Sequence, residues 1–188
     1  MRYDFLLETY RTERLKTLGV WAQVPEDWLR RRVEPRARTP LEHMVHQCQS
    51  EHNWMDGMLG IRTARAPLPP RETRDAFIAH YGTCAADRLE QLAALAEAWF
   101  EEETAFFDVT RTRAWVLTRR FTHTAHHRGQ LVAMLRAWGL SLYSTYGPTA
   151  DTGGLPKNGA RVIYRGDDGP PALPGPGASA PTERPEDT

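Results

Sequence analysis

The stretch from residue 113 to residue 138, RAWVLTRRFTHTAHHRGQLVAMLRAW, decides the fold. Its inward residues recur at steps of three and four, which is the period of one helical face. This face carries Val116, Arg120, His123, His127, Leu131, Met134 and Trp138. Gly139 follows at once and suits the position just after a helix C-terminus. The stretch predicts a long amphipathic helix with two histidines on its inward side.

Three further helices are expected upstream of this one. Residues 3–21 place large apolar side chains at helical spacing before Pro25. The second helix begins at Thr39-Pro40-Leu41-Glu42, a capping box with proline at the first helical position, and runs to about Gly60. The third covers about residues 72–101, and nothing before residue 139 alternates as a strand does. We expect an all-α four-helix bundle of the up-down type with one longer crossover.

The C-terminal part of the chain has a different composition. From Gly166 onward it contains almost only proline, glycine, small and charged residues. Such a segment buries too little apolar area to offset the entropy lost on ordering. We therefore expect one bundle domain over residues 1–152 and a Pro/Gly-rich, largely disordered extension over residues 153–188.

Composition narrows the class of protein. The 188 residues carry 24 basic and 24 acidic side chains, and this zero net charge argues against a dedicated nucleic-acid binder. No stretch is apolar enough for a membrane span, and the N-terminus lacks the apolar core of a signal peptide. Cys48 and Cys84 do not have the spacing of a metal or redox motif, which fits a reduced compartment. The expectation is a cytoplasmic protein with no membrane contact.

Six of the seven histidines lie in two clusters. His123 and His127 are four residues apart on one helical face, so they can share a metal ion or be two core histidines with hydrogen-bond partners. His126 lies about 100° away from His127 around the helix. In the second helix the apolar stripe includes His52, whereas His46 lies at its flank. Helical pattern alone therefore favours His52 as a third ligand or a core histidine.

Three segments resemble the DinB family, a group of damage-inducible, metal-binding four-helix bundles that includes the YfiT-like proteins. Residues 123–131, HTAHHRGQL, resemble the HxxxHRGQ signature of that family. Residues 39–46, TPLEHMVH, resemble its capped second helix, and residues 146–151, YGPTAD, resemble the segment that follows its fourth helix. The resemblance covers about residues 1–152.

The resemblance implies a divalent metal held by three histidines, which by position are His46, His123 and His127. It is the resemblance, and not the helical pattern, that selects His46 over His52. Three imidazoles suit zinc or nickel and leave positions free for water or substrate. Similar proteins include thiol S-transferases that use bacillithiol or mycothiol, and a thiol-dependent isomerase. The implied function is a metal-dependent enzyme that activates a low-molecular-weight thiol cosubstrate, or water, against a small electrophile.

Two alternative functions remain open at this stage. The histidines can instead stabilise a non-catalytic stress-response protein by tying two helices together. DNA binding, suggested by arginine clusters at residues 30–38 and 111–120, is the weaker alternative. Acidic residues are interleaved with the first cluster, the chain is neutral, and no reading motif is present. A homodimer is also expected, because the large apolar residues exceed what a small bundle needs inside: Trp21, Trp28, Trp54, Met55 and Met58.

Several other side chains have both a functional and an ordinary interpretation. Glu51 can be a general base or, more commonly, an ion-paired helix glutamate. Cys48 is expected to be a small buried thiol. Arg128 and Gln130 can orient the signature helix, contact substrate or belong to its solvated flank. The remaining histidines, His43, His80 and His126, are expected at the surface or behind the ligands.

Overall fold

A computed structural model of the chain describes residues 2–140 and residue 142. The long helices are α1 (Asp4–Ala22), α2 (Pro40–His52), α3 (Arg74–Ala93) and α5 (Arg113–Ala137). Shorter elements lie between them: the 3-10 turn η1 (Glu26–Trp28), the π-helical turn η2 (Asn53–Met58), helix α4 (Glu97–Glu101), and strands β1 (Glu103–Phe106) and β2 (Val109–Thr112). The segment 146–151 and the extension 153–188 lie outside the described residues.

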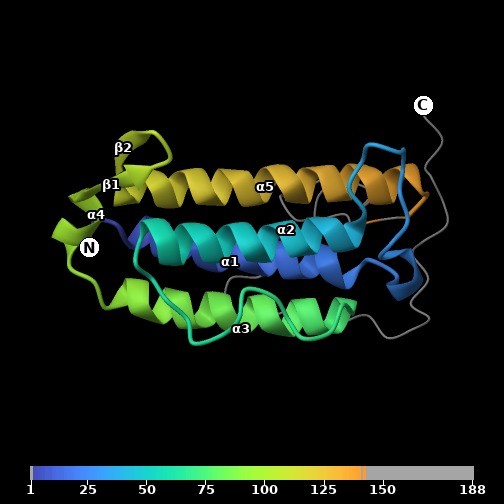
Figure 1. The fold of residues 1–188 in the computed structure, drawn as a ribbon, viewed down its shortest axis with the longest axis horizontal. Helices are drawn as coiled ribbons and strands as arrows, with labels where there is room; N and C mark the ends of the chain where they lie inside the picture. Colours follow the sequence, from blue (N-terminus) through green and yellow to red (C-terminus); the bar gives the residue numbers. More distant parts are fainter. Residues whose placement is uncertain (1, 141, 143–188) are drawn as a thin grey trace, which may run out of the picture.

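The four long helices lie side by side along the long axis of the molecule (Figure 1). Helix α1 packs against α3 and α5, and α2 packs mainly against α5. Helices α2 and α3 run in the same direction, so the connection over residues 59–73 travels the length of the bundle (Figure 1). The helical bundle with one longer crossover is therefore confirmed.

Local sequence sets the limits of α2 and α5. Thr39 accepts a hydrogen bond from the backbone N–H of Glu42, whose side chain accepts one from the backbone N–H of Thr39, so the expected capping box is present. At its other end α2 continues directly into the π-helical turn, and Gly60 follows with φ of 71°. Gly139 follows α5 with φ of 84°, the left-handed conformation that favours glycine after a helix.

Two expectations about the segment before α5 are wrong. The helix expected over residues 72–101 is divided into α3 and α4, and the turn between them lets Phe100 stack on Tyr3, with ring centroids 4.9 Å apart. A β-hairpin also precedes α5, with Phe106 paired to Val109 across a two-residue turn. Its strands have four residues each and β2 is exposed throughout, so no buried alternation marked them in the sequence.

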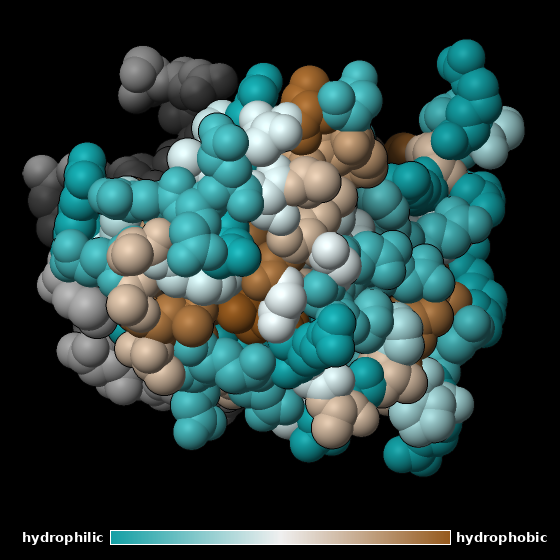
Figure 2. Space-filling model, turned by 60° about the vertical axis from the view of Figure 1, so that its left-hand side comes forward, coloured by the Kyte–Doolittle hydropathy of each residue, from teal (hydrophilic) through white to brown (hydrophobic). Residues whose placement is uncertain are grey.

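The core consists of two apolar clusters with a polar layer between them. One cluster includes Trp21, Met44 and Tyr81, and the other includes Tyr10 and Met55. Figure 2 turns the hairpin end of the bundle toward the viewer, and there apolar groups reach the surface in patches divided by hydrophilic ones. None of the described helices has the length and apolar character that a membrane crossing requires.

Candidate metal centre

Helices α2 and α5 bring three histidines together near the middle of the bundle. His46 Nε2 lies 3.0 Å from His127 Nε2, which lies 3.2 Å from His123 Nε2. All three ligand atoms lie within 4.8 Å of one another. Because α2 and α5 pack directly, His46 faces the pair that the four-residue spacing on α5 aligns.

Hydrogen bonding fixes the ring orientation of His127. Its Nδ1 lies 2.8 Å from Gln130 Oε1, which accepts the Nδ1 proton, so Nε2 carries a lone pair. That single lone pair faces the Nε2 atoms of both His46 and His123. One lone pair cannot accept good hydrogen bonds from two ring N–H groups at once. A cation, in contrast, accepts a lone pair from each of the three nitrogens.

The spacing of these nitrogens fits a first-row divalent ion. With metal–nitrogen bonds of about 2.0–2.1 Å, ligand nitrogens lie about 2.8–3.4 Å apart at angles from 90° to tetrahedral. Two of the three pairs, at 3.0 and 3.2 Å, are already in that range. The donor set and the geometry are therefore suited to a divalent metal, and three ligands leave further positions free.

His123 is held by two residues besides its neighbouring histidines. Arg120 Nη1 donates to His123 Nδ1 over 2.8 Å, and the ring of Trp54 stacks on the imidazole with centroids 5.3 Å apart. Because Nδ1 accepts, the ring proton of metal-free His123 lies on Nε2. Metal binding through Nε2 requires that proton to move to Nδ1, so His123 must change tautomer and give up the hydrogen bond from Arg120.

The other histidines of these helices do not join the cluster. His52, which the helical pattern favoured, lies half-buried with Nε2 3.8 Å from Asp56 Oδ2. His126 is exposed, as expected. His43 is buried beside His127, with ring centroids 5.7 Å apart, so of its two expected placements the one behind the proposed ligands is observed. Its three-residue spacing from His46, which repeats one helical face, was the available signal.

Comparison with known proteins identifies the family. The DinB family model matches residues 2–154. The chain belongs to the DinB family. Among solved structures, a DinB-like protein from Bacillus cereus ATCC 10987 superposes with a TM-score of 0.65 at 17% identity, over 75% of this chain and 95% of the other. The DinB-like protein YjoA from Bacillus subtilis gives 0.58 at 15% identity, over 74% and 96%. No curated protein matches in sequence.

This DinB chain buries a charged network next to its histidines. Glu51 is 1% exposed and accepts hydrogen bonds of 2.6 Å from the hydroxyls of both Tyr10 and Tyr81. Its carboxylate also lies 3.2 Å from Arg88 Nη1 and 3.6 Å from Arg120 Nη2. Burial and the charge of Glu51 raise the pKa of both tyrosines well above 10. Glu51 is therefore an ion-paired structural carboxylate and not a solvated one.

The DinB signature segment also places its other polar residues. Arg128 is 2% exposed and pairs with Glu13 of α1 at 2.5 Å, with a further hydrogen bond to Thr17. Gln130 is the acceptor that orients His127. Arg128 therefore joins α5 to α1 inside the bundle, while Gln130 acts at the histidine cluster. Neither residue is merely part of a solvated flank.

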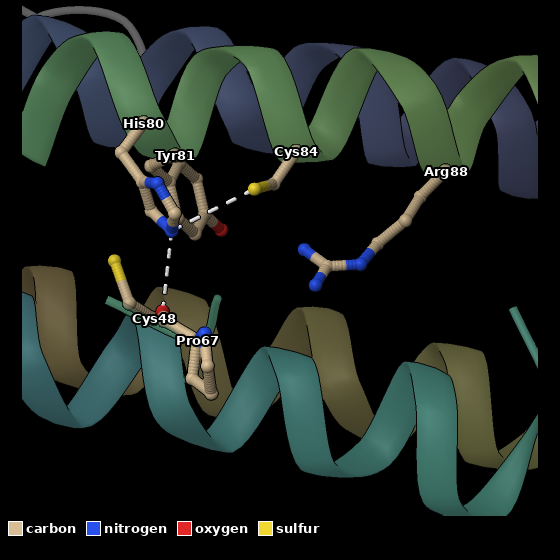
Figure 3. Close-up of a pocket in the computed structure, with 6 residues that line it drawn as sticks. All are labelled: Cys48, Pro67, His80, Tyr81, Cys84 and Arg88. Atoms are coloured by element: carbon tan, nitrogen blue, oxygen red, sulfur yellow. Dashed lines mark hydrogen bonds between the residues drawn. The ribbon is translucent and has the colours of Figure 1, made fainter. Parts of the chain in front are cut away.

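A cavity of about 10 Å³ lies on the other side of α2. It is lined by Cys48, Pro67, His80, Tyr81, Cys84 and Arg88 (Figure 3). His80 Nε2 lies 3.2 Å from the Pro67 carbonyl oxygen and 3.7 Å from Cys84 Sγ. Burial raises the pKa of both thiols, so they are held in the protonated, unreactive form. The space suffices for about one water molecule.

Stability of the metal-free protein is expected to fall as the pH drops from 6.5 toward 4. Burial, followed by the charges of His127 and Arg38, lowers the pKa of His43 from 6.5 to about 4. In this window the unfolded chain binds a proton that the folded chain excludes, which favours unfolding by up to about 1.4 kcal/mol per pH unit for this ring. Urea unfolding with chelator at pH 7, 6, 5 and 4 measures the slope. An unfolding free energy that rises toward pH 4 contradicts this.

Proposed function

We propose that this chain is a metal-dependent enzyme in which His46, His123 and His127 hold a divalent ion, zinc or nickel. The reaction is attack by a low-molecular-weight thiol, or by water, on a small electrophile. The convergence of three imidazole Nε2 atoms from two helices carries the proposal. The resemblance to thiol S-transferases supports the choice of a thiol as cosubstrate.

An ion at this position lowers the pKa of a coordinated thiol or water and so supplies a nucleophile near neutral pH. The chain prepares the position for it. Gln130 holds His127 in the tautomer whose Nε2 is free, and Trp54 supports the ring of His123. The three histidines would be neutral ligands and would leave the charge of such an ion unbalanced, which would favour a thiol cosubstrate that binds as an anion.

Access to the site comes from the exposed side of His46 and His123. His46 and His123 are half-buried, whereas His127 is buried behind them. A small molecule can therefore reach the ligands only from that side. Burial lowers the pKa of His123 to about 3 and that of His127 to about 4, so both rings are neutral and able to bind metal at pH 7.

Thiol transfer is tested with 1-chloro-2,4-dinitrobenzene as the electrophile. The protein is stripped with a chelator, reloaded with Zn²⁺ or Ni²⁺, and mixed with bacillithiol, mycothiol, cysteine or glutathione. The thiol sulfur forms the new carbon–sulfur bond, chloride leaves, and the thiol proton passes to buffer. We expect at least about tenfold faster thioether formation in the loaded protein than in stripped protein, because the metal raises the thiolate fraction.

His123→Ala loaded under the same conditions is the matched control and is expected to behave as stripped protein. Thiol transfer is contradicted if the loaded protein has bound metal and still reacts no faster than stripped protein or His123→Ala. That result favours the non-catalytic stress-response role.

DNA binding gains no support from the arginines, since Arg30 pairs with Glu72 and Arg120 is buried.

The homodimer remains a prediction, and fewer residues now support it. Trp21 and Met55 are fully buried within the chain, and Trp54 is 8% exposed, so these three residues are not free for a partner subunit. Light scattering at micromolar concentration decides between dimer and monomer.

A further inference from the structure

Exposed apolar side chains gather at the hairpin and the start of α5. Phe107 is 70% exposed, and Val109 and Trp115 are 40% exposed each. These are three of the five large hydrophobic residues that are exposed among the described residues. Exposed apolar residues that cluster on an otherwise charged surface usually indicate a binding site.

Phe107 occupies a backbone position that glycine usually takes. Its φ is 53°, in the left-handed region that a bulky residue rarely adopts. The two-residue turn joins Phe106 to Val109, and a turn with positive φ at its first central residue normally has glycine there. A phenylalanine at this position strains the turn and leaves its ring largely in water, so the fold gains little from it.

Ring contacts connect Phe107 to the histidine cluster. Its centroid lies 4.8 Å from that of Phe106 and 6.1 Å from that of Trp54. Trp54 in turn stacks on His123, and Phe106 contacts Trp115 at 5.0 Å. We call the four residues Trp54, Phe106, Phe107 and Trp115 the aromatic shelf. The shelf runs from Trp54, whose ring stacks on the proposed metal ligand His123, to the exposed ring of Phe107.

Size and charge indicate what the shelf binds. Phe107, Val109 and Trp115 together expose on the order of 300 Å², whereas a standard dimer interface needs about 800 Å² from each partner. Cations lie beside it, because the Arg111 guanidinium lies 5.4 Å from the Trp115 ring centroid and that of Arg120 lies 5.7 Å from the Trp54 ring centroid. The occupant is therefore a small aromatic group and not a second copy of the chain.

We propose that the aromatic shelf binds the aromatic group of a small organic substrate whose reacting atom lies at the three histidines. This inference rests on the proposed function and specifies its substrate class as aryl-bearing thiols or electrophiles. Phe107 and Trp115 contact the flat face or edge of the substrate ring, and the buried ring of Trp54 links Phe107 to His123. Phe107 is a specificity residue that contacts substrate and does not hold metal.

Two thiols that differ only by a phenyl ring test the inference. Protein loaded with Co²⁺ is titrated with propane-1-thiol and with 3-phenylpropane-1-thiol, and the sulfur-to-cobalt charge-transfer absorption gives each dissociation constant. We expect the phenyl thiol to bind about tenfold more tightly, and Phe107→Ala to lose most of that preference. Phe5→Ala is the matched control, since Phe5 is an exposed phenylalanine of α1 whose ring lies beside Tyr3.

The outcomes separate this inference from the proposed function. Loss of the preference in Phe107→Ala alone, with Co²⁺ content unchanged, supports the shelf. Equal preference in Phe107→Ala and unaltered protein overturns the shelf and leaves the metal site standing. Absence of bound Co²⁺ from unaltered protein overturns the proposed function itself. A dimer that Phe107→Ala converts to a monomer overturns the shelf in favour of a subunit contact.

Discussion

Replacing His46 by alanine is expected to lower the affinity for zinc or nickel more than about 100-fold, because the loss of a residue that merely supports a ligand already costs about 10–100-fold. His46 is the ligand that we propose for α2, with Nε2 3.0 Å from that of His127. Without it, the remaining pair on α5 binds metal as a two-residue site. Elemental analysis after dialysis against a weak chelator, followed by competition titration, measures the change.

His52→Ala is the matched control for this substitution. His52 lies on the same helix, is also half-buried, and lies beside Asp56 instead of the cluster. It is expected to retain metal at the level of unaltered protein. Retained metal in His46→Ala, or its loss in His52→Ala, contradicts the assignment. Circular dichroism on each variant verifies that the helices remain folded.

Glu51→Gln is expected to lower the free energy of unfolding by about 3–5 kcal/mol, the cost of removing one member of a buried ion pair. Glu51 is the carboxylate between the side chains of Arg88 and Arg120, which are themselves 4% and 0% exposed. The tyrosine hydroxyls donate to different oxygens of Glu51, so a glutamine keeps only one of these two acceptors, and it leaves two buried cations without an anion. Urea unfolding of metal-free protein measures the loss without the stabilisation that a bound ion adds.

Glu72→Gln provides the comparison for a surface pair. Glu72 pairs with Arg30 at 2.7 Å, but both side chains are more than half exposed. Its loss is expected to change stability by no more than about 1 kcal/mol. If Glu51→Gln and Glu72→Gln have similar small effects, the buried network does not hold the helices together in the way proposed here.

Helix limits and the α5 histidine pair were predictable from local chemistry. The capping box at Thr39 and the glycine at residue 139 act over a few residues, so the sequence alone indicates where α2 begins and α5 ends. The four-residue spacing of His123 and His127 sets their common face whatever the tertiary structure. These features are short-range, and the structure agrees with them.

The face that α2 buries was not predictable from hydropathy. Gln47 and Glu51 are 0% and 1% exposed, so the inward side of this helix carries polar residues. The apolar stripe therefore pointed to His52 and placed His46 at the flank. Only knowledge of α5, whose buried Arg120 donates to the Gln47 carbonyl oxygen, shows why the polar side of α2 faces inward. The family signature supplied what the hydrophobic pattern lacked.

The hairpin was missed for a different reason. Its strands are four residues long and lie over the end of the bundle instead of in a sheet core, so they lack a buried face. The turn at Phe107 has neither asparagine nor glycine, the usual hairpin signal. Sequence rules for hairpins describe the common turn types, and this turn lacks the residues typical of them. It lies where we propose that substrate binds.

The order of the helices along the chain has a consequence for synthesis on the ribosome. His46 precedes His127 by 81 residues, and Glu13 precedes its partner Arg128 by 115 residues. A nascent chain from which α5 has not yet emerged therefore has only one of the three histidines, and Glu13 lacks the contact with Arg128. The proposed three-histidine site therefore cannot form on the ribosome until α5 has been made.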